Sequence, residues 1–177
     1  HGDDPMGRRG GASDSDESAN LLQQGAHEGR DENEVKGIAM SKRIVVCGDD
    51  FGMNADIDEG MIALAGMGRL SAVSCLTLGP SFAANAGRLA LMNVDIGLHV
   101  NFTEALAPGA EPMPTLGRLI LNAYAGRLDA AWIDAQLERQ FDAFEAAFGR
   151  APDYVDGHQH VHQLPGIRAR LLLLLKR

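Results

Sequence analysis

From residue 40 onward, short apolar runs alternate with longer segments of helical periodicity, and this alternation constrains the fold more than any other feature. We expect strands at 44–47, 72–78, 94–100 and 154–156, which are short, β-branched or apolar and flanked by polar turns. We expect helices at 55–67, 81–92, 116–124, 129–148 and 166–177. Such alternation predicts an α/β fold of parallel βα repeats with right-handed crossovers. Four strands do not close a barrel, so we expect an open sheet or part of a larger (β/α) barrel.

The start of the chain differs in composition from the rest. Residues 1–39 are rich in Gly, Asp, Glu and Ser and carry few large apolar side chains, so we predict a disordered N-terminal segment. Met40 precedes the first expected strand and is a plausible natural start. We therefore place the folded domain at 40–177, and we expect the helix at its end to lie against the sheet.

The net charge indicates which partners the chain can bind, and the cysteines indicate its cellular compartment. The net charge of -8 and the absence of a basic stripe argue against nucleic-acid binding. The longest apolar run, 171–175, is far shorter than the roughly 20 residues of a membrane span. Cys47 and Cys75 have no metal-type or disulfide-type spacing, so we expect reduced thiols in a cytoplasmic protein.

Three polar motifs follow three of the expected strands. Gly-Asp-Asp-Phe-Gly, with Asp49 and Asp50, follows the first strand, and His99 ends the third. Asp-Gly-His-Gln-His-Val-His, with His158, His160 and His162, follows the fourth. The carboxyl ends of parallel strands meet at one edge of a sheet or barrel, where ligands bind. We therefore expect the three motifs to converge.

Carboxylates and imidazoles together are typical ligands of Zn²⁺ and related divalent ions. Asp49 and Asp50 point opposite ways on an extended segment, so one can bind a metal ion while the other takes a proton from water. The histidines at 158, 160 and 162 would share one face if their segment were extended. Each motif alone has a simpler explanation: an ordinary capped turn for Asp-Asp-Phe-Gly, a core residue for His99, and a solvated turn for the histidines.

The motifs VCGDDFGMNADIDEGMIALAGMGRLSAVSCLTLGPSF, IGLHVNFT and YVDGHQHVHQLPGIR resemble the YdjC-like (ChbG/HpnK) family of carbohydrate deacetylases over residues 43–177. The resemblance implies an irregular TIM-like (β/α) barrel that removes acetyl groups from N-acetylated sugars such as chitooligosaccharides. It implies one divalent ion, Mg²⁺ or Zn²⁺, held by Asp50, His99 and His158, with Asp49 as the base. His160 and His162 would line the site.

The resemblance also indicates that Asp156 is a partner of a ligand imidazole. Family members continue well beyond the position of Arg177, with a late His-Pro motif, so the resemblance implies a truncated chain, an open barrel and the possibility that this chain is inactive. Three alternatives stay open. They are a metal-dependent hydrolase of phosphoesters or other amides, a hopanoid-pathway deacetylase acting on a lipid-linked amino sugar, and a truncated, non-catalytic sugar-binding protein. The chain could also assemble as a homodimer.

Overall fold

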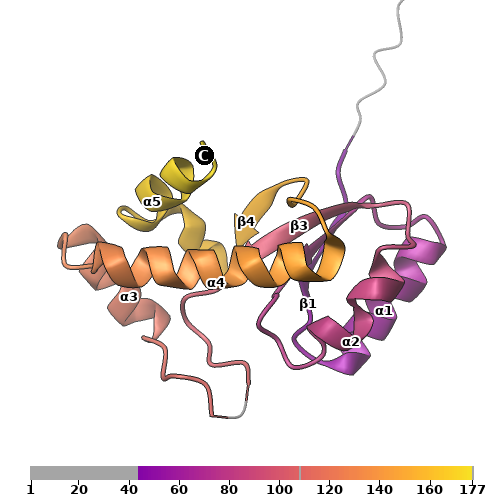
Figure 1. Ribbon diagram of the computed structural model, residues 1–177, viewed down its shortest axis with the longest axis horizontal. Helices are drawn as coiled ribbons and strands as arrows, with labels where there is room; N and C mark the ends of the chain where they lie inside the picture. Colours follow the sequence, from indigo (N-terminus) through magenta and orange to yellow (C-terminus); the bar gives the residue numbers. More distant parts are fainter. Residues whose placement is uncertain (1–43, 108, 177) are drawn as a thin grey trace, which may run out of the picture. The chain divides into compact units, whose positions relative to one another are not determined.

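The computed structural model describes residues 44–107 and 109–176; the segment predicted to be disordered, 1–39, lies outside them. The described part contains a four-stranded parallel sheet with the strand order β1-β2-β3-β4 (Figure 1). The strands are β1 (Cys47–Phe51), β2 (Ala72–Cys75), β3 (Asp95–Val100) and β4 (Val155–Gly157). Helices connect successive strands, so the predicted α/β fold of parallel βα repeats is confirmed.

The helices are α1 (Ala55–Gly66), α2 (Phe82–Leu89), α3 (Leu116–Tyr124), α4 (Ala130–Phe148) and α5 (Ile167–Leu174), with a 3₁₀ segment η1 (His158–Gln163) before α5. Side-chain caps begin three of them, because Asn54, Thr115 and Asp129 each accept a backbone N–H of the first turn. Gly149 ends α4 in the left-handed conformation that favours glycine. No helix in the described residues combines the length and the apolar character that crossing a bilayer requires.

The first strand begins three residues later than predicted. Ile44 and Val45 are 80% and 73% exposed, and the strand starts only at Cys47. A strand is defined by its ladder of hydrogen bonds, and among residues 44–46, the described residues before Cys47, only Val46 has backbone hydrogen bonds toward β2, through Ser71 and Ala72. The Asp-Asp pair therefore lies within β1, and the prediction that its motif follows the first strand was wrong.

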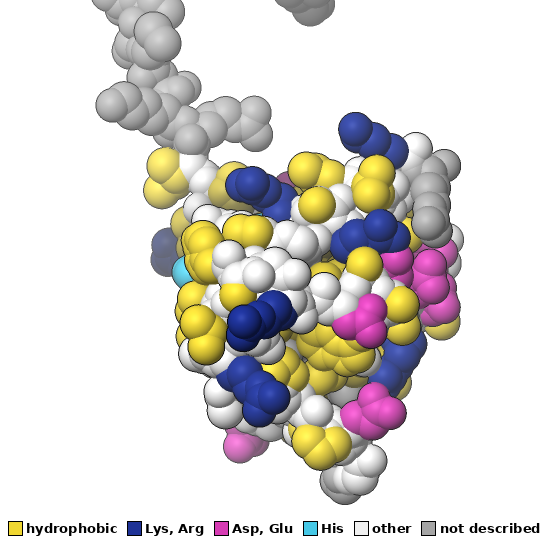
Figure 2. Space-filling model, turned by 90° about the vertical axis from the view of Figure 1, so that its left-hand side faces the viewer, with side chains coloured by type: hydrophobic (Ala, Val, Ile, Leu, Met, Phe, Trp, Pro, Cys, Tyr) yellow, Lys and Arg dark blue, Asp and Glu magenta, His cyan; other side chains and the backbone are white. Residues whose placement is uncertain are grey.

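Smaller differences affect other elements. β2 ends at Cys75 because the chain then turns, with the N–H of Gly79 donating to the carbonyl of Leu76 at 2.9 Å. Ser81 occupies the N-cap position of α2 but its side chain makes no capping hydrogen bond. α5 packs mainly against α4 and η1, and Leu172 and Leu173 are about half exposed. The end of the molecule that carries α3 and α5 accordingly shows hydrophobic side chains between basic ones (Figure 2).

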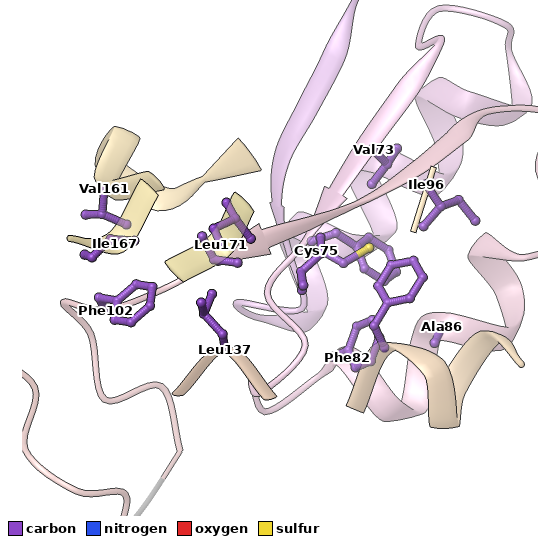
Figure 3. Close-up of a cluster of buried hydrophobic side chains, with 14 of the residues drawn as sticks. Val73, Cys75, Phe82, Ala86, Ile96, Phe102, Leu137, Val161, Ile167 and Leu171 are labelled. Carbon is purple, nitrogen blue, oxygen red and sulfur yellow. The ribbon is translucent and has the colours of Figure 1, made fainter. Parts of the chain in front are cut away.

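The core lies on one face of the sheet. Side chains alternate across a strand, so the buried Val73 and Cys75 of β2 and Ile96 of β3 share one face. They pack with Phe82 and Ala86 of α2 (Figure 3). A further part of the same cluster joins η1, α4 and α5 through Val161, Leu137, Ile167 and Leu171. The opposite face of the sheet carries polar side chains.

This polar face is curled. β1 and β4 are three strand spacings apart, about 14 Å in a flat sheet, yet Oδ1 of Asp50 in β1 lies 2.8 Å from Nδ1 of His158, which directly follows β4. The Tyr154 ring crosses β3 at Gly97, where a Cβ atom would lie 2.3 Å from the ring. The four strands curl toward each other without closing, and residues from β1, β3 and β4 therefore meet on the concave side.

Candidate metal centre

Asp50 enters the concave face through a β-bulge in β1. Between Gly48 and Phe51 the register with β2 shifts, because three steps along β1 match two along β2, from Val73 to Cys75. Asp50 has φ 71°, a left-handed conformation that Asp tolerates better than most residues. Backbone strain of this kind is stored mainly at functional sites. The bulge changes where the side chain of Asp50 points relative to a regular strand.

A buried carboxylate and a close backbone contact fix the backbone at Gly52, directly after this bulge. The carboxylate of Asp58 on α1, which is fully buried, accepts the backbone N–H of Gly52 at 2.6 Å. Its other oxygen accepts a hydrogen bond from Asn85 of α2 at 2.8 Å. The carbonyl of Gly52 lies so close to Gly79 that a Cβ there would be 2.0 Å away. The two helices and the following turn thus hold the Asp-Asp motif in place.

Asp50, His99 and His158 form a compact cluster at the carboxyl ends of β1, β3 and β4. Oδ1 of Asp50 lies 2.8 Å from Nδ1 of His158 and 3.4 Å from Nε2 of His99. One ligand atom from each residue lies within 4.8 Å of the others. The imidazoles are 4% and 8% exposed and meet edge to face. The convergence predicted from the sequence is therefore present, with atoms suited to holding one divalent ion.

Asp156 orients His99. Its Oδ1 lies 2.7 Å from Nδ1 of His99 and accepts a hydrogen bond from Ser74 at 2.8 Å. Burial opposes ionisation of Asp156, but the hydrogen bond and charge of His99, together with Ser74, outweigh it and hold the pKa of the carboxyl below its usual value. An ionised Asp156 favours a proton on Nδ1, which leaves the lone pair of Nε2 facing Asp50. The arrangement matches the partner role that the resemblance implied for Asp156.

Asp49 lies in a second, neighbouring group with Cys47 and Asp156, whose ligand atoms are also within 4.8 Å of one another. Burial raises the pKa of the Cys47 thiol; Tyr154 lowers it, and a hydrogen bond from the thiol to Asp49 raises it further. Asp49 is exposed while Asp50 is half buried. The two aspartates thus have different neighbours, but they do not point to opposite faces as predicted for an extended segment: the bulge brings both to the side of the sheet that carries His99 and Asp156. Asp49 stands beside the cluster rather than in it.

The histidine segment is not extended, so the prediction that three histidines share one face was wrong. Residues 158–163 form η1, in which Gln159 and His160 have left-handed backbone conformations with φ 52° and 60°. Only His158 joins the cluster; His160 is exposed and its ring stands beside that of His162. Burial lowers the pKa of His162, which favours the neutral imidazole. Both residues line an open hollow with Tyr124 and Leu172, and their role at the site stays a prediction.

Glu104 was missed by the sequence reasoning. Its Oε1 lies 3.2 Å from Nε2 of His158, on the side of the ring away from Asp50. An Asn101 turn holds it: Oδ1 of Asn101 accepts the N–H groups of Thr103 and Glu104 at 3.0 and 3.1 Å. An Asn side chain that accepts backbone N–H groups two or three residues further on is a recognised signal for a turn. Asn101 directly follows β3. That signal predicts a turn but gives no partner for Glu104.

A pocket lies next to Glu104, under the loop that follows β3. Its volume is about 230 Å³, and its lining includes Leu78, Leu106, Met113 and Arg139. This volume is below the range of about 300–1,000 Å³ for complete small-ligand sites. The pocket can therefore hold only a small ligand or part of a larger one.

The fold and the cluster define a class: a parallel α/β protein with a carboxylate and two imidazoles gathered at the carboxyl ends of its strands. The sequence profile of YdjC-like proteins matches residues 43–177. The chain therefore belongs to the YdjC-like family, which confirms the resemblance found in the sequence motifs.

Two relatives show how far the similarity extends. The carbohydrate deacetylase of Homo sapiens is 33% identical over 137 residues, which is 71% of this chain and 42% of that protein. The chitooligosaccharide deacetylase of Serratia marcescens is 35% identical over 136 residues, 72% of this chain and 53% of that protein. The chain thus spans about half the length of these curated relatives.

A crystal structure with a similar fold is that of a candidate cellobiose-phosphate cleavage protein from Enterococcus faecalis V583. It superposes with a TM-score of 0.62 over 75% of this chain and 54% of that chain. At 19% sequence identity the likeness concerns the fold alone.

Proposed function

We propose that Asp50, His99 and His158 bind one divalent cation. The observation that carries the proposal is the preformed cluster: one carboxylate oxygen and two imidazole nitrogens from three strand ends, already within 4.8 Å of each other. Three protein ligands with room for water are typical of catalytic rather than structural zinc sites. The two nitrogen donors favour Zn²⁺ over Mg²⁺, which prefers oxygen ligands. Mg²⁺ remains the alternative that the family resemblance implied.

The reaction we propose is removal of an acetyl group from an N-acetylated carbohydrate, which gives acetate and a free amine. The names of the human and Serratia relatives support this substrate class. A bound divalent ion would supply polarisation of the acetyl carbonyl and a water of lowered pKa. We assign to Asp49, which stands beside the cluster and outside the ligand group, the role of accepting a proton from the attacking water. Asp50 and the two imidazoles would hold this ion on the concave face.

The substrate proposed is a chitooligosaccharide-type N-acetylated sugar, in the cytoplasm. A lipid-linked amino sugar of the hopanoid pathway is an alternative substrate for the same chemistry. A non-catalytic sugar-binding protein is the alternative from a different functional class.

Acetate release from diacetylchitobiose, with metal analysis of the same sample, tests this function. We expect release that depends on added Zn²⁺ or Mg²⁺. Asp49→Asn should lose most of that activity, by about 100-fold or more, because it removes the proton acceptor. The variant should keep its metal, because Asp49 is not a proposed ligand. Metal binding without any acetate release would favour the non-catalytic sugar-binding candidate, and loss of metal in Asp49→Asn would contradict the assigned roles.

A further inference from the structure

We propose that Glu104 is a positioning residue that holds His158 in the orientation and tautomer needed to present Nδ1 to the cation. This inference rests on the proposed metal site and goes beyond its three ligands. His158 is 8% exposed, and its Nε2 is buried without a hydrogen bond of good geometry in the described residues. The nearest carboxylate oxygen, Oε1 of Glu104, is 3.2 Å away, within reach of a small ring rotation.

The two imidazoles face Asp50 with different ring nitrogens. His99 has Nδ1 on Asp156, at 2.7 Å, and turns Nε2 toward Asp50. His158 has Nδ1 beside Asp50, at 2.8 Å, and turns Nε2 toward Glu104. Each ring therefore has one nitrogen in the cluster and the other facing a carboxylate. Imidazole ligands of metal ions generally donate their second N–H to such a partner, which fixes the ring and raises its basicity.

Proton placement explains why a carboxylate is needed at this position. Without a cation, the contact of Nδ1 with Asp50 is satisfied when Nδ1 carries the proton. A cation on Nδ1 requires that nitrogen to have a free lone pair, so a neutral His158 must carry its proton on Nε2. The proton leaves Nδ1 to solvent and another is taken up at Nε2, with no net change. Glu104 then accepts the hydrogen bond from a buried N–H that would otherwise be unsatisfied.

Hydrogen bonds hold the backbone of Glu104 in place without any bound ligand. Asn101 bonds its backbone at both ends, accepting the N–H at 3.1 Å and donating to the carbonyl at 2.7 Å. Asn101 is itself fixed by the buried Gln140 of α4, whose side chain accepts the N–H and donates to the carbonyl of Asn101 at 2.7 and 3.0 Å. A chain of hydrogen bonds thus runs from α4 to the loop that carries Glu104. Glu104 is not in the group of ligand atoms around Asp50, which argues against direct ligation.

Titration of the folded chain with Zn²⁺ tests the inference, using Glu104→Ala, Glu104→Gln and the control Glu111→Ala. We expect Glu104→Ala to weaken Zn²⁺ binding by about 10–100-fold, the usual cost of removing such a partner. Glu104→Gln should lose much less, because its carbonyl oxygen can still accept the Nε2 hydrogen. Glu111 is an exposed glutamate in the same loop, so its replacement controls for the loss of one negative charge.

A second measurement, by NMR, distinguishes the loss of the Glu104–His158 hydrogen bond from a general effect on folding. In the Zn²⁺-loaded protein we expect a slowly exchanging, hydrogen-bonded Nε2–H signal of His158 by NMR, present in the wild type and in Glu104→Gln and absent in Glu104→Ala. Unchanged Zn²⁺ affinity in Glu104→Ala would overturn the inference while leaving the metal site intact. Equal, complete loss in Glu104→Gln and Glu104→Ala would make Glu104 a ligand and also overturn it. A wild type that binds no Zn²⁺ would instead overturn the proposed function itself.

Discussion

At the scale of single residues, the site depends on which polar side chains the backbone turns toward one point. Asp50 reaches the cluster through a bulge with a left-handed φ of 71°, and His158 through the end of β4. His160, two residues further, is turned away because the backbone there is also left-handed. Spacing along the sequence therefore identifies the motif, and local backbone conformation decides which histidine takes part.

Two variants test whether His158, and not His160, binds the cation. His158→Ala should abolish tight divalent-cation binding, because it removes one of three proposed ligands. His160→Ala should bind the cation with an affinity within about twofold of the wild type, since its exposed ring lies outside the cluster. Isothermal titration with Zn²⁺ measures both. If His158→Ala retained wild-type affinity while His160→Ala lost it, the assignment of ligands along this segment would have to be exchanged.

At the scale of elements, close approaches of backbone to backbone hold the motif that carries Asp49 and Asp50. Gly79 lies against the carbonyl of Gly52, where a Cβ would come within 2.0 Å. We expect Gly79→Ala to destabilise the fold by about 1–3 kcal/mol, because the turn must move to relieve the overlap. Gly60→Ala is the control: Gly60 is exposed in the middle of α1, where an added Cβ meets nothing within 4 Å.

The control should stabilise the chain by about 0.5–1 kcal/mol through the higher helix propensity of alanine. Urea unfolding of the two variants measures the difference in free energy. Equal stabilities for Gly79→Ala and the wild type would show that the turn after β2 has more room than the structure gives it.

A second contact between elements is sensitive to pH. Oδ2 of Asp153 accepts the backbone N–H of Ile96 at 2.7 Å, which ties the start of β4 to β3. The hydrogen bond from Arg150 outweighs burial and, with that backbone N–H, lowers the pKa of Asp153. A folded-state pKa below the unfolded value of about 3.9 gives stability that is present above that pH and is lost as the pH falls through the folded pKa.

Asp153→Asn should therefore be less stable than the wild type at neutral pH, by less than about 1 kcal/mol because the pair is partly exposed. The difference should shrink as the pH falls below about 4. Urea unfolding of both proteins across this pH range checks the trend. A difference that grows in acid would have the wrong sign and would contradict this account of Asp153.

Elements differ in how far the sequence could predict them. The limits of α3 agree with the prediction and those of α4 differ by one residue, because apolar periodicity and the caps Thr115, Asp129 and Gly149 are local signals. The start of β1 could not be predicted from its own residues, since Ile44 and Val45 are apolar but have no ladder partner in the described part. The meeting of Asp50 with His99 followed from the rule for parallel strand ends. The partner role of Asp156 followed only from the family resemblance. The approach of Glu104 to His158 depends on curvature, rotamers and loop geometry, which local patterns do not contain.

At the scale of the whole molecule, the cluster joins three strand ends that the sequence places far apart. A cation that binds only the folded chain must therefore stabilise the entire domain by mass action, by about 2.7 kcal/mol at 100 times its dissociation constant. Thermal unfolding with and without Zn²⁺ measures this, with His158→Ala as the variant that should not respond. A rise in the unfolding temperature that is equal in both proteins would show that the ion binds elsewhere.

Anomalous diffraction from crystals of the chain grown with Zn²⁺ tests the central claim most directly. We predict one ion at about 2.0–2.2 Å from a carboxylate oxygen of Asp50, Nε2 of His99 and Nδ1 of His158. A peak at another place, or a ring of His158 that binds through Nε2, would contradict the account.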